Sequence, residues 1–218
     1  MKHLLLAPPS ALAYFSALVA EDVGFALLEA AICVAHDEPA PPDAQTVLAD
    51  IDRLAGRLKA RLPADASAIR RLQALNRYFF GELGFAANVN NYYDRRNSYL
   101  HEVLASRRGI PITLALLYIE LASQLGLSAF GVSFPGHFLV KLRMPQGGVV
   151  IDPVNGRSLS REDLDERLGP FRARYGLEGD FDTPLGLFLQ AAPPRDVLAR
   201  LLFNLKEIHR TKDRKSVV

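Results

Sequence analysis

The sequence contains one cysteine, Cys33, so the chain cannot form an internal disulfide bond. Cys33 lies in the apolar stretch GFALLEAAICVA, which predicts a buried helix with an inert thiol, as in proteins of a reducing compartment. No uninterrupted apolar run approaches the roughly 20 residues that a membrane-spanning helix needs. These features predict a soluble, cytoplasmic protein that does not act at a membrane.

The chain also has little net charge, because 26 lysines and arginines face 24 aspartates and glutamates, for a net charge of +2. Such a balance does not indicate a dedicated nucleic-acid binder. Basic residues cluster from Arg53 through Arg77 and in the final segment KEIHRTKDRKSVV, as they do on many helical surfaces and charged tails. We therefore expect no nucleic-acid partner, and we expect no cofactor and no metal ion.

The first residues, MKHLLLAPPSALA, have the basic start and short apolar run of a secretion signal. Pro8 and Pro9 interrupt this run, and the apolar helical pattern continues past the cleavage-like Ala11-Leu12-Ala13. The sequence therefore predicts that no signal is cleaved here.

The hydrophobic fraction, 49% of 218 residues, is large enough for a sizeable core. Ser10, Asp43 and Ser67 stand where N-caps belong, each before a stretch with helical periodicity. The clearest stripe, in TVLADIDRLAGRLKARL, consists of Val47, Leu48, Ile51, Leu54, Leu58 and Leu62. Residues 1–87 are therefore expected to form a helical N-terminal portion.

The stretch RRNSYLHEVLASRRG predicts a short helix with Asn97 as its cap and Gly109 as its stop. Pro111 suits the first turn of a following helix, because an amide at that position would be unpaired anyway. Gly126 is expected to end this second helix after about Gln124. Its apolar residues occupy several faces, so it is predicted to be central and buried.

Three short β-rich stretches follow, SAFGVSF, HFLVKLRM and GVVIDPV, and they predict an antiparallel sheet. Ser160 begins a near capping box in SREDLDERLG, and an amphipathic helix follows Pro193-Pro194. The fold class is therefore α+β, with a core at 88–190. Residues 191–218 are expected to form a C-terminal amphipathic helix with a basic tail.

His137 and Asp152 stand out in the sheet region, because a hairpin of these lengths brings the start of one strand beside the end of the next. An aspartate beside a histidine orients the imidazole and stabilises its charged form. The alternative is a surface histidine and an aspartate that makes a turn before Pro153. Spacing alone leaves both interpretations open.

The stretches GIPITLALLYIELASQLGL, PGHFLVKL and VVIDPVNG resemble the core of the transglutaminase-like superfamily. In that superfamily a cysteine at a helix start, a histidine on a strand and an aspartate on a strand form a catalytic triad. More narrowly, NNYYDRRNSYLHEVLASRRGIPITLALLY, FPGHFLVKL and IDPVNG resemble the N-terminal module of the bacterial SirB family. The resemblance extends from about Asn88 to Asn155.

By this resemblance, His137 is the triad histidine and Asp152 is the triad acid, while the nucleophile position falls on Pro111. Proline offers no nucleophile, so the scaffold of a cysteine enzyme is expected without its reagent. Thr113 or Ser98 is an alternative nucleophile, if His137 activates its hydroxyl. The ordinary role of both hydroxyls is to cap or bond the backbone.

Other polar residues of the SirB-like stretch are candidates to line one cleft with the histidine and aspartate: Asn97, Ser98, Glu102, Arg107 and Arg108. An arginine there is able to bind a carboxylate or a phosphate. Their ordinary roles are helix capping, helix surface and compensation of the helix dipole. Tyr92 and Tyr93 are expected to pack into the sheet, the alternative being an aromatic contact with a partner.

The leading interpretation is a non-catalytic transglutaminase-like module that binds a protein or peptide, in a regulatory role. The alternative is a hydrolase or acyl transferase that uses Thr113 or Ser98 with His137 and Asp152. The resemblance also implies that tetratricopeptide-like repeats often follow such a module, and LLFNLKEIHR is a candidate for the first helix of such an array. At least three repeats are needed for a solenoid core, so no repeat domain is expected in this chain.

Overall fold

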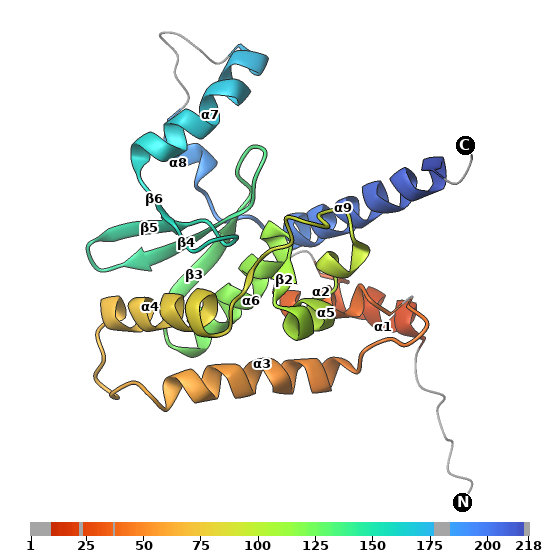
Figure 1. The fold of residues 1–218 in the computed structure, drawn as a ribbon, viewed down its shortest axis with the longest axis horizontal. Helices are drawn as coiled ribbons and strands as arrows, with labels where there is room; N and C mark the ends of the chain where they lie inside the picture. The colour runs from red at the N-terminus through yellow and green to blue at the C-terminus, as the bar shows by residue number, and fades with distance from the viewer. Residues whose placement is uncertain (1–9, 22–23, 37, 177–183, 216–218) are drawn as a thin grey trace, which may run out of the picture.

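The computed structural model describes residues 10–21, 24–36, 38–176 and 184–215, and Figure 1 shows its helices grouped around a small sheet. Most of the signal-like start and the end of the basic tail lie outside the described residues. The expected α+β class is confirmed, because helices precede and follow an antiparallel sheet.

Three helices of the first half begin directly after the predicted caps Ser10, Asp43 and Ser67, whereas the helix that begins at Leu27 has no side-chain cap. In chain order, these helices are α1 (Ala11–Leu18), α2 (Leu27–Cys33), α3 (Ala44–Lys59) and α4 (Ala68–Asn76), and a short π-helical turn, η1 (Arg77–Glu82), continues α4. The Asp43 carboxylate accepts from Thr46 N at 3.0 Å and the Ser67 hydroxyl from Arg70 N at 3.3 Å. Such caps each contribute on the order of 1 kcal/mol to stability, so they fix where these helices start.

Helix α6 (Pro111–Gln124) is central, as expected, and Pro111 occupies its first turn. Leu114, Leu117 and Tyr118 on this helix are fully buried. Gly126, at φ 74°, ends the helix, and the amide of Leu127 returns to the carbonyl of Ala122 at 2.9 Å. The helix packs against α3, α4, α5, α9 and the first two strands of the larger sheet, so it connects both halves of the chain.

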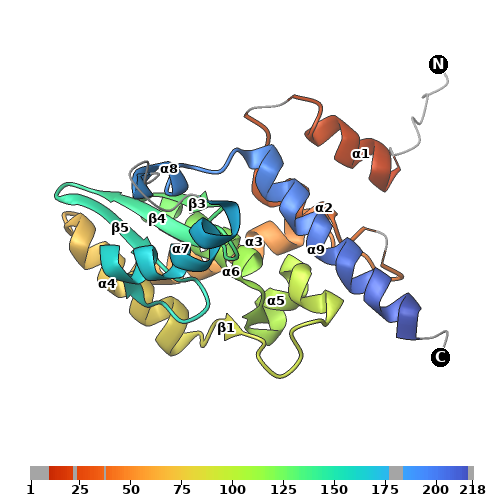
Figure 2. The same cartoon turned by 90° about the horizontal axis from the view of Figure 1, so that it is seen from above.

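The larger sheet is antiparallel, in the order β3 (Ser128–Val132), β4 (Leu139–Met144), β5 (Gly147–Ile151) and β6 (Ser158–Leu159). Three of these strands were predicted; β6 has only two residues, too few for a sequence pattern. Neighbouring side chains on β4 point to opposite faces. Val140 belongs to the main hydrophobic cluster with α6, while Leu139 belongs to a second cluster with α7. Both faces of the sheet are therefore covered, as Figure 2 shows.

The segment before α6 differs from the prediction. Helix α5 spans Leu100–Ser106, after a 3₁₀ turn, η2 (Arg95–Ser98), so Asn97 does not cap it. Helix α5 ends at Arg107, which adopts φ 61° and ψ 19°, and not at Gly109. Gly109 instead belongs to β2 (Arg108–Gly109), which pairs in parallel with β1 (Ala86–Ala87). This pairing requires an extended backbone at 108–109, so the helix cannot continue to Gly109.

The remaining helices are α7 (Arg161–Tyr175), α8 (Leu185–Phe188) and α9 (Pro194–Lys215). The predicted capping box is present at α7, because Asp163 N donates to the Ser160 hydroxyl and Ser160 N to the Asp163 carboxylate. Figure 2 shows α9 lying across the helical side of the molecule, where it contacts α2 and η2. The boundaries drawn from the sequence at residues 88 and 191 stay predictions.

Candidate functional site

His137 lies in the turn that joins β3 to β4, two residues before β4 begins. Gly136 makes this turn possible, since its φ of 71° is unfavourable for other residues. The amide of His137 donates to the carbonyl of Phe134 at 3.0 Å, and the carbonyl of His137 accepts from Arg200 on α9 at 2.9 Å. The backbone of the histidine is thus held from two sides, while 24% of its side chain remains exposed.

Asp152 directly follows β5, and Ile151 of that strand pairs with Val140 of β4. This register brings Asp152 to the end of the hairpin at which His137 lies. The Asp152 Oδ1 is 2.9 Å from the His137 Nε2, so the predicted hydrogen-bonded pair is present. Both residues stand just outside the strands, whereas the sequence interpretation put His137 at the start of one strand and Asp152 at the end of the next.

Asp152 also pairs with an arginine. Arg167, on α7, donates to the Asp152 Oδ2 at 3.0 Å, and the amide of Val154 donates to Oδ1 at 3.2 Å. Burial of the carboxyl acts to raise its pKa, but the hydrogen bonds from His137, Arg167 and Val154 outweigh it, so the pKa of Asp152 lies below its ordinary value. Asp152 is therefore a carboxylate at neutral pH.

This charge state fixes the tautomer of a neutral His137. A carboxylate only accepts hydrogen bonds, so the proton of the imidazole sits on Nε2. The basic nitrogen is then Nδ1, which points away from the Asp152 bond. The arrangement is that of an oriented imidazole able to accept a proton or a hydrogen bond at one nitrogen.

The Thr113 hydroxyl bonds to the backbone and does not act as a nucleophile would. Its side chain is fully buried, and its hydroxyl accepts from Ile110 N at 3.1 Å. The same hydroxyl shares its single proton between two backbone carbonyls, that of Asn97 at 2.9 Å and that of Ile110 at 3.0 Å. Thr113 therefore closes the first turn of α6, and its oxygen is engaged by the backbone.

Ser98 is also fully buried, and its hydroxyl has no hydrogen-bond partner among the described residues. The His137 ring bonds to Asp152 alone in the described part of the chain. Neither hydroxyl therefore contacts the imidazole, and the alternative with an activated hydroxyl is not favoured by the geometry.

Asn97 organises the loop before α5. Its amide nitrogen donates to the carbonyls of Asn91 at 2.7 Å and Tyr92 at 3.1 Å, and its amide oxygen accepts from Asn88 at 2.9 Å. Because the loop is held by this buried side chain, its tyrosines need not pack into the sheet. Tyr92 is 49% exposed and Tyr93 is 69% exposed, so the expectation that they pack into the sheet was wrong.

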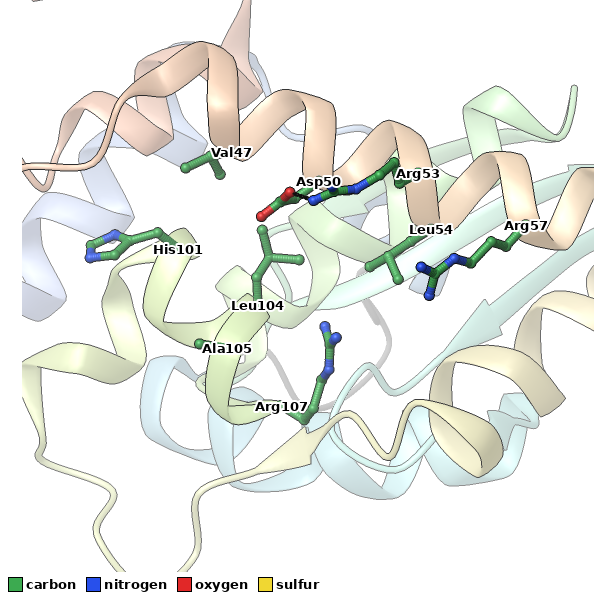
Figure 3. Close-up of a pocket in the computed structure, with 9 residues that line it drawn as sticks. All are labelled: Val47, Asp50, Arg53, Leu54, Arg57, His101, Leu104, Ala105 and Arg107. Carbon is green, nitrogen blue, oxygen red and sulfur yellow. Dashed lines mark ion pairs between the residues drawn. The ribbon is translucent and has the colours of Figure 1, made fainter.

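The charged cleft candidates lie in separate surroundings. Arg108 donates to the carbonyl of Gly84 at 2.6 Å, and partly exposed Glu102 lies 3.9 Å from His101. Arg107 lines a pocket between α3 and α5, and neither His137 nor Asp152 is among the residues that line it (Figure 3). His137, Asp152 and Arg167 therefore lie together, whereas Arg107 lies in a different pocket.

Arg167 is the residue of this site that the sequence interpretation missed. It is one of several arginines on α7, and only the packing of that helix on the sheet brings it to Asp152. Its distance from His137 in the sequence does not identify it as a residue of this site.

Cys33, the one thiol, is unsuited to chemistry. It is 4% exposed in the core, and burial, followed by the nearby Glu29 carboxylate, raises its pKa to about 11. The thiolate is the reactive form, so Cys33 is inert near neutral pH.

In the residues that the structure describes, no group of three or more histidines, cysteines, aspartates or glutamates is arranged to hold a metal ion. No helix in the described ranges combines the length and the apolar character that crossing a membrane demands.

Comparison with known proteins agrees with this architecture. Residues 45–203 match the family model described as the transglutaminase-like superfamily. A UPF0162 protein of Xylella fastidiosa is 39% identical over 195 residues, which cover 89% of this chain and 68% of that protein. A UPF0162 protein of Pseudomonas aeruginosa is 35% identical over 184 residues, covering 84% of this chain and 65% of that one.

A more distant likeness is local. Human F-box only protein 21 is 41% identical over 81 residues, which are 37% of this chain and 13% of that protein. No solved structure matched the chain. The superfamily match covers more than half of the chain, and the Xylella relative is matched over two thirds of its length. The chain therefore belongs to the transglutaminase-like superfamily and, within it, to the bacterial UPF0162 family.

Proposed function

We propose that the chain is a SirB-type, non-catalytic transglutaminase-like module that binds a protein or peptide in a regulatory role. In this proposal Pro111 occupies the position at which catalytic members of the superfamily carry cysteine. The observation that carries the proposal is Pro111 in the first turn of α6, in a chain that keeps the paired His137 and Asp152. Its inert core thiol suits a reducing compartment, and we propose that the module acts in the cytoplasm.

Without a nucleophile, the remaining groups are suited to binding. The His137 Nδ1 is able to accept a hydrogen bond, and the first turn of a helix carries a partial positive charge. Arg200 on α9 fixes the backbone of His137, because it donates to the His137 carbonyl at 2.9 Å. Exposed Tyr92 and Tyr93 offer the large, rigid contact area that is common in interfaces.

The mapping of Pro111 onto a vacated nucleophile position is tested by restoring the thiol. In Pro111→Cys/Cys33→Ala, we expect a thiol pKa below the ~8.5 of a free cysteine, because the helix N-terminus and a protonated His137 both favour thiolate. The substitution should cost about 1 kcal/mol or less, since other residues are accepted at the first helical position. The measurement is the pH dependence of iodoacetamide modification.

Two variants control this experiment. Ser123→Cys/Cys33→Ala puts a thiol on the exposed C-terminal part of the same helix, where the dipole disfavours thiolate, and its pKa should be at or above that of free cysteine. Adding His137→Ala to Pro111→Cys/Cys33→Ala should raise the thiol pKa again. If the thiol at 111 titrates near 8.5 with and without His137, Pro111 does not face the His137–Asp152 pair, and the mapping is wrong.

Peptide binding is tested with a random peptide display library panned against the wild-type chain. We expect enriched peptides whose affinity falls about tenfold in Tyr92→Ala and in His137→Ala, since a good interface contact contributes more than 1 kcal/mol. Arg70→Gln, an exposed residue of α4, is the matched control and should bind normally. A library that enriches no peptide, or peptides that bind all three variants alike, would count against the proposal.

A further inference from the structure

A surface pocket of about 490 Å³ lies between α3 and α5, away from the His137–Asp152 pair. Figure 3 shows α3 along one side of this pocket and α5 along the other. Its volume is within the range of small-molecule sites. The lining consists of Val47, Asp50, Arg53, Leu54, Arg57, His101, Leu104, Ala105 and Arg107.

The pocket has an excess of positive charge. It contains three arginines and one acidic residue, and the acid, Asp50, is already paired with Arg53 on the same helix. Arg57 and Arg107 form no ion pair with any residue in the described ranges. Figure 3 shows their guanidinium groups turned toward the space between the helices, one from each side.

Arg107 is held there by an unusual backbone. It is the one residue other than glycine with a positive φ, 61°, in the part of the chain that the structure describes. Glycine or asparagine is the usual residue at this position after a helix. The strained conformation directs a long cationic side chain into the pocket, where its guanidinium stacks over Phe85 at 4.8 Å.

The charge on Arg107 is partly desolvated and incompletely paired. Its Nη1 is buried and has no hydrogen-bond partner in the described structure, and burial lowers the pKa of the guanidinium. Burying a cation without an acceptor is unfavourable. An anion in the pocket would supply the missing acceptor and restore the balance of charge.

The rest of the lining is apolar. Val47, Leu54 and Leu104 are buried side chains whose edges face the pocket. His101 lies at its far end, with a buried Nδ1 that also has no partner among the described residues. The pocket therefore has arginines at one end, apolar side chains along its floor and His101 at the other end.

We propose that this pocket binds a small molecule in which a phosphate monoester is attached to an apolar group. Arg57 and Arg107 bind the phosphate through charge-assisted hydrogen bonds, and the apolar group lies on Leu54 and Leu104. A phosphate monoester carries between −1.5 and −2 charges at neutral pH, which suits two unpaired guanidinium groups better than the single charge of a carboxylate. The site is separate from the proposed peptide-binding site and does not depend on it.

The test uses the whole chain and three probes: phenyl phosphate, inorganic phosphate and benzoate. Binding is followed by calorimetry and by the amide NMR signals of α3 and α5. We expect saturable binding of phenyl phosphate, tighter than binding of inorganic phosphate, which lacks the apolar contact, and tighter than that of benzoate. Arg57→Gln should weaken the binding of phenyl phosphate about tenfold, because a charge-assisted hydrogen bond is lost. Arg57 is an exposed helix residue, so the chain should still fold.

Arg107→Gln should abolish the binding. If Arg107→Gln does not fold, the result for Arg57→Gln alone decides the test. Arg70→Gln, on the exposed surface of α4, removes one positive charge elsewhere and should leave the affinity unchanged. Equal weakening in Arg57→Gln and Arg70→Gln would show general attraction by charge, and it would overturn the proposal. Benzoate that binds as tightly as phenyl phosphate would overturn the assignment to phosphate, and absence of binding in the wild type would overturn the site itself.

Discussion

Asp152→Ala is expected to lower the free energy of unfolding by about 3 kcal/mol, as measured by urea denaturation at pH 7. Asp152 is 2% exposed, and its carboxylate binds His137, Arg167 and the amide of Val154. Removing one partner of a buried ionic cluster leaves the other charges uncompensated, which costs roughly 3–5 kcal/mol. His137 and Arg167 keep some access to water, so the lower end of this range applies.

The effect should depend on pH in a definite direction. The pKa of Asp152 is lower in the folded chain than the ~3.9 of an unfolded aspartate, so the folded state binds protons less readily. Its contribution is complete above the unfolded pKa and is lost as the pH falls through the folded pKa. The difference between wild type and Asp152→Ala should therefore shrink as the pH falls below about 4. A difference that keeps growing below pH ~4 would contradict this account.

Gly156→Ala is the second substitution with a large expected effect, also about 3 kcal/mol. Gly156 has φ 75°, and a Cβ placed there would enter the ring of Phe80, with Phe80 Cε2 only 2.7 Å away. The left-handed conformation costs an L-residue about 1–2 kcal/mol, and forced overpacking costs about 1–3 kcal/mol. The amide of Gly156 also donates to the carbonyl of Asp152 at 2.8 Å, so the turn that carries the acid would be distorted.

Two further variants separate these causes. Gly84 has φ 70° and nothing within 4 Å of an added Cβ, so Gly84→Ala should show the backbone strain alone, about 1 kcal/mol. Phe80→Leu should relieve most of the clash, so Gly156→Ala should cost less in that background. Equal losses for Gly84→Ala and Gly156→Ala would mean that Phe80 moves aside freely.

Much of the fold follows from local signals in the sequence. The hydroxyl and carboxylate caps at Ser10, Asp43 and Ser67 determine helix starts, because they satisfy amides that have no partner within the helix. The hairpin spacing of His137 and Asp152 allowed their pairing but left a turn aspartate as the alternative, and the family resemblance favoured the pair.

Other features depend on tertiary packing and have no local signal. Arg167 reaches Asp152 only because α7 covers the second face of the sheet. The stop of α5 at Arg107 was missed because a non-glycine residue takes a left-handed conformation there, against its intrinsic preference. Asn97 was predicted to be a helix cap, yet its side chain donates to a backbone carbonyl of the preceding loop. Sequence periodicity does not predict the path of such a loop.

Asn97 joins two parts of the molecule through different groups. Its side chain holds the tyrosine loop at the carbonyls of Asn91 and Tyr92, while its own carbonyl accepts from Thr113 in the first turn of α6. A force that displaces the loop therefore acts, through one buried residue, on the start of the central helix. Asn97 thus links the loop to the start of the helix, and we expect a partner of the kind proposed above, bound at Tyr92 and Tyr93, to affect the first turn of α6 without touching it.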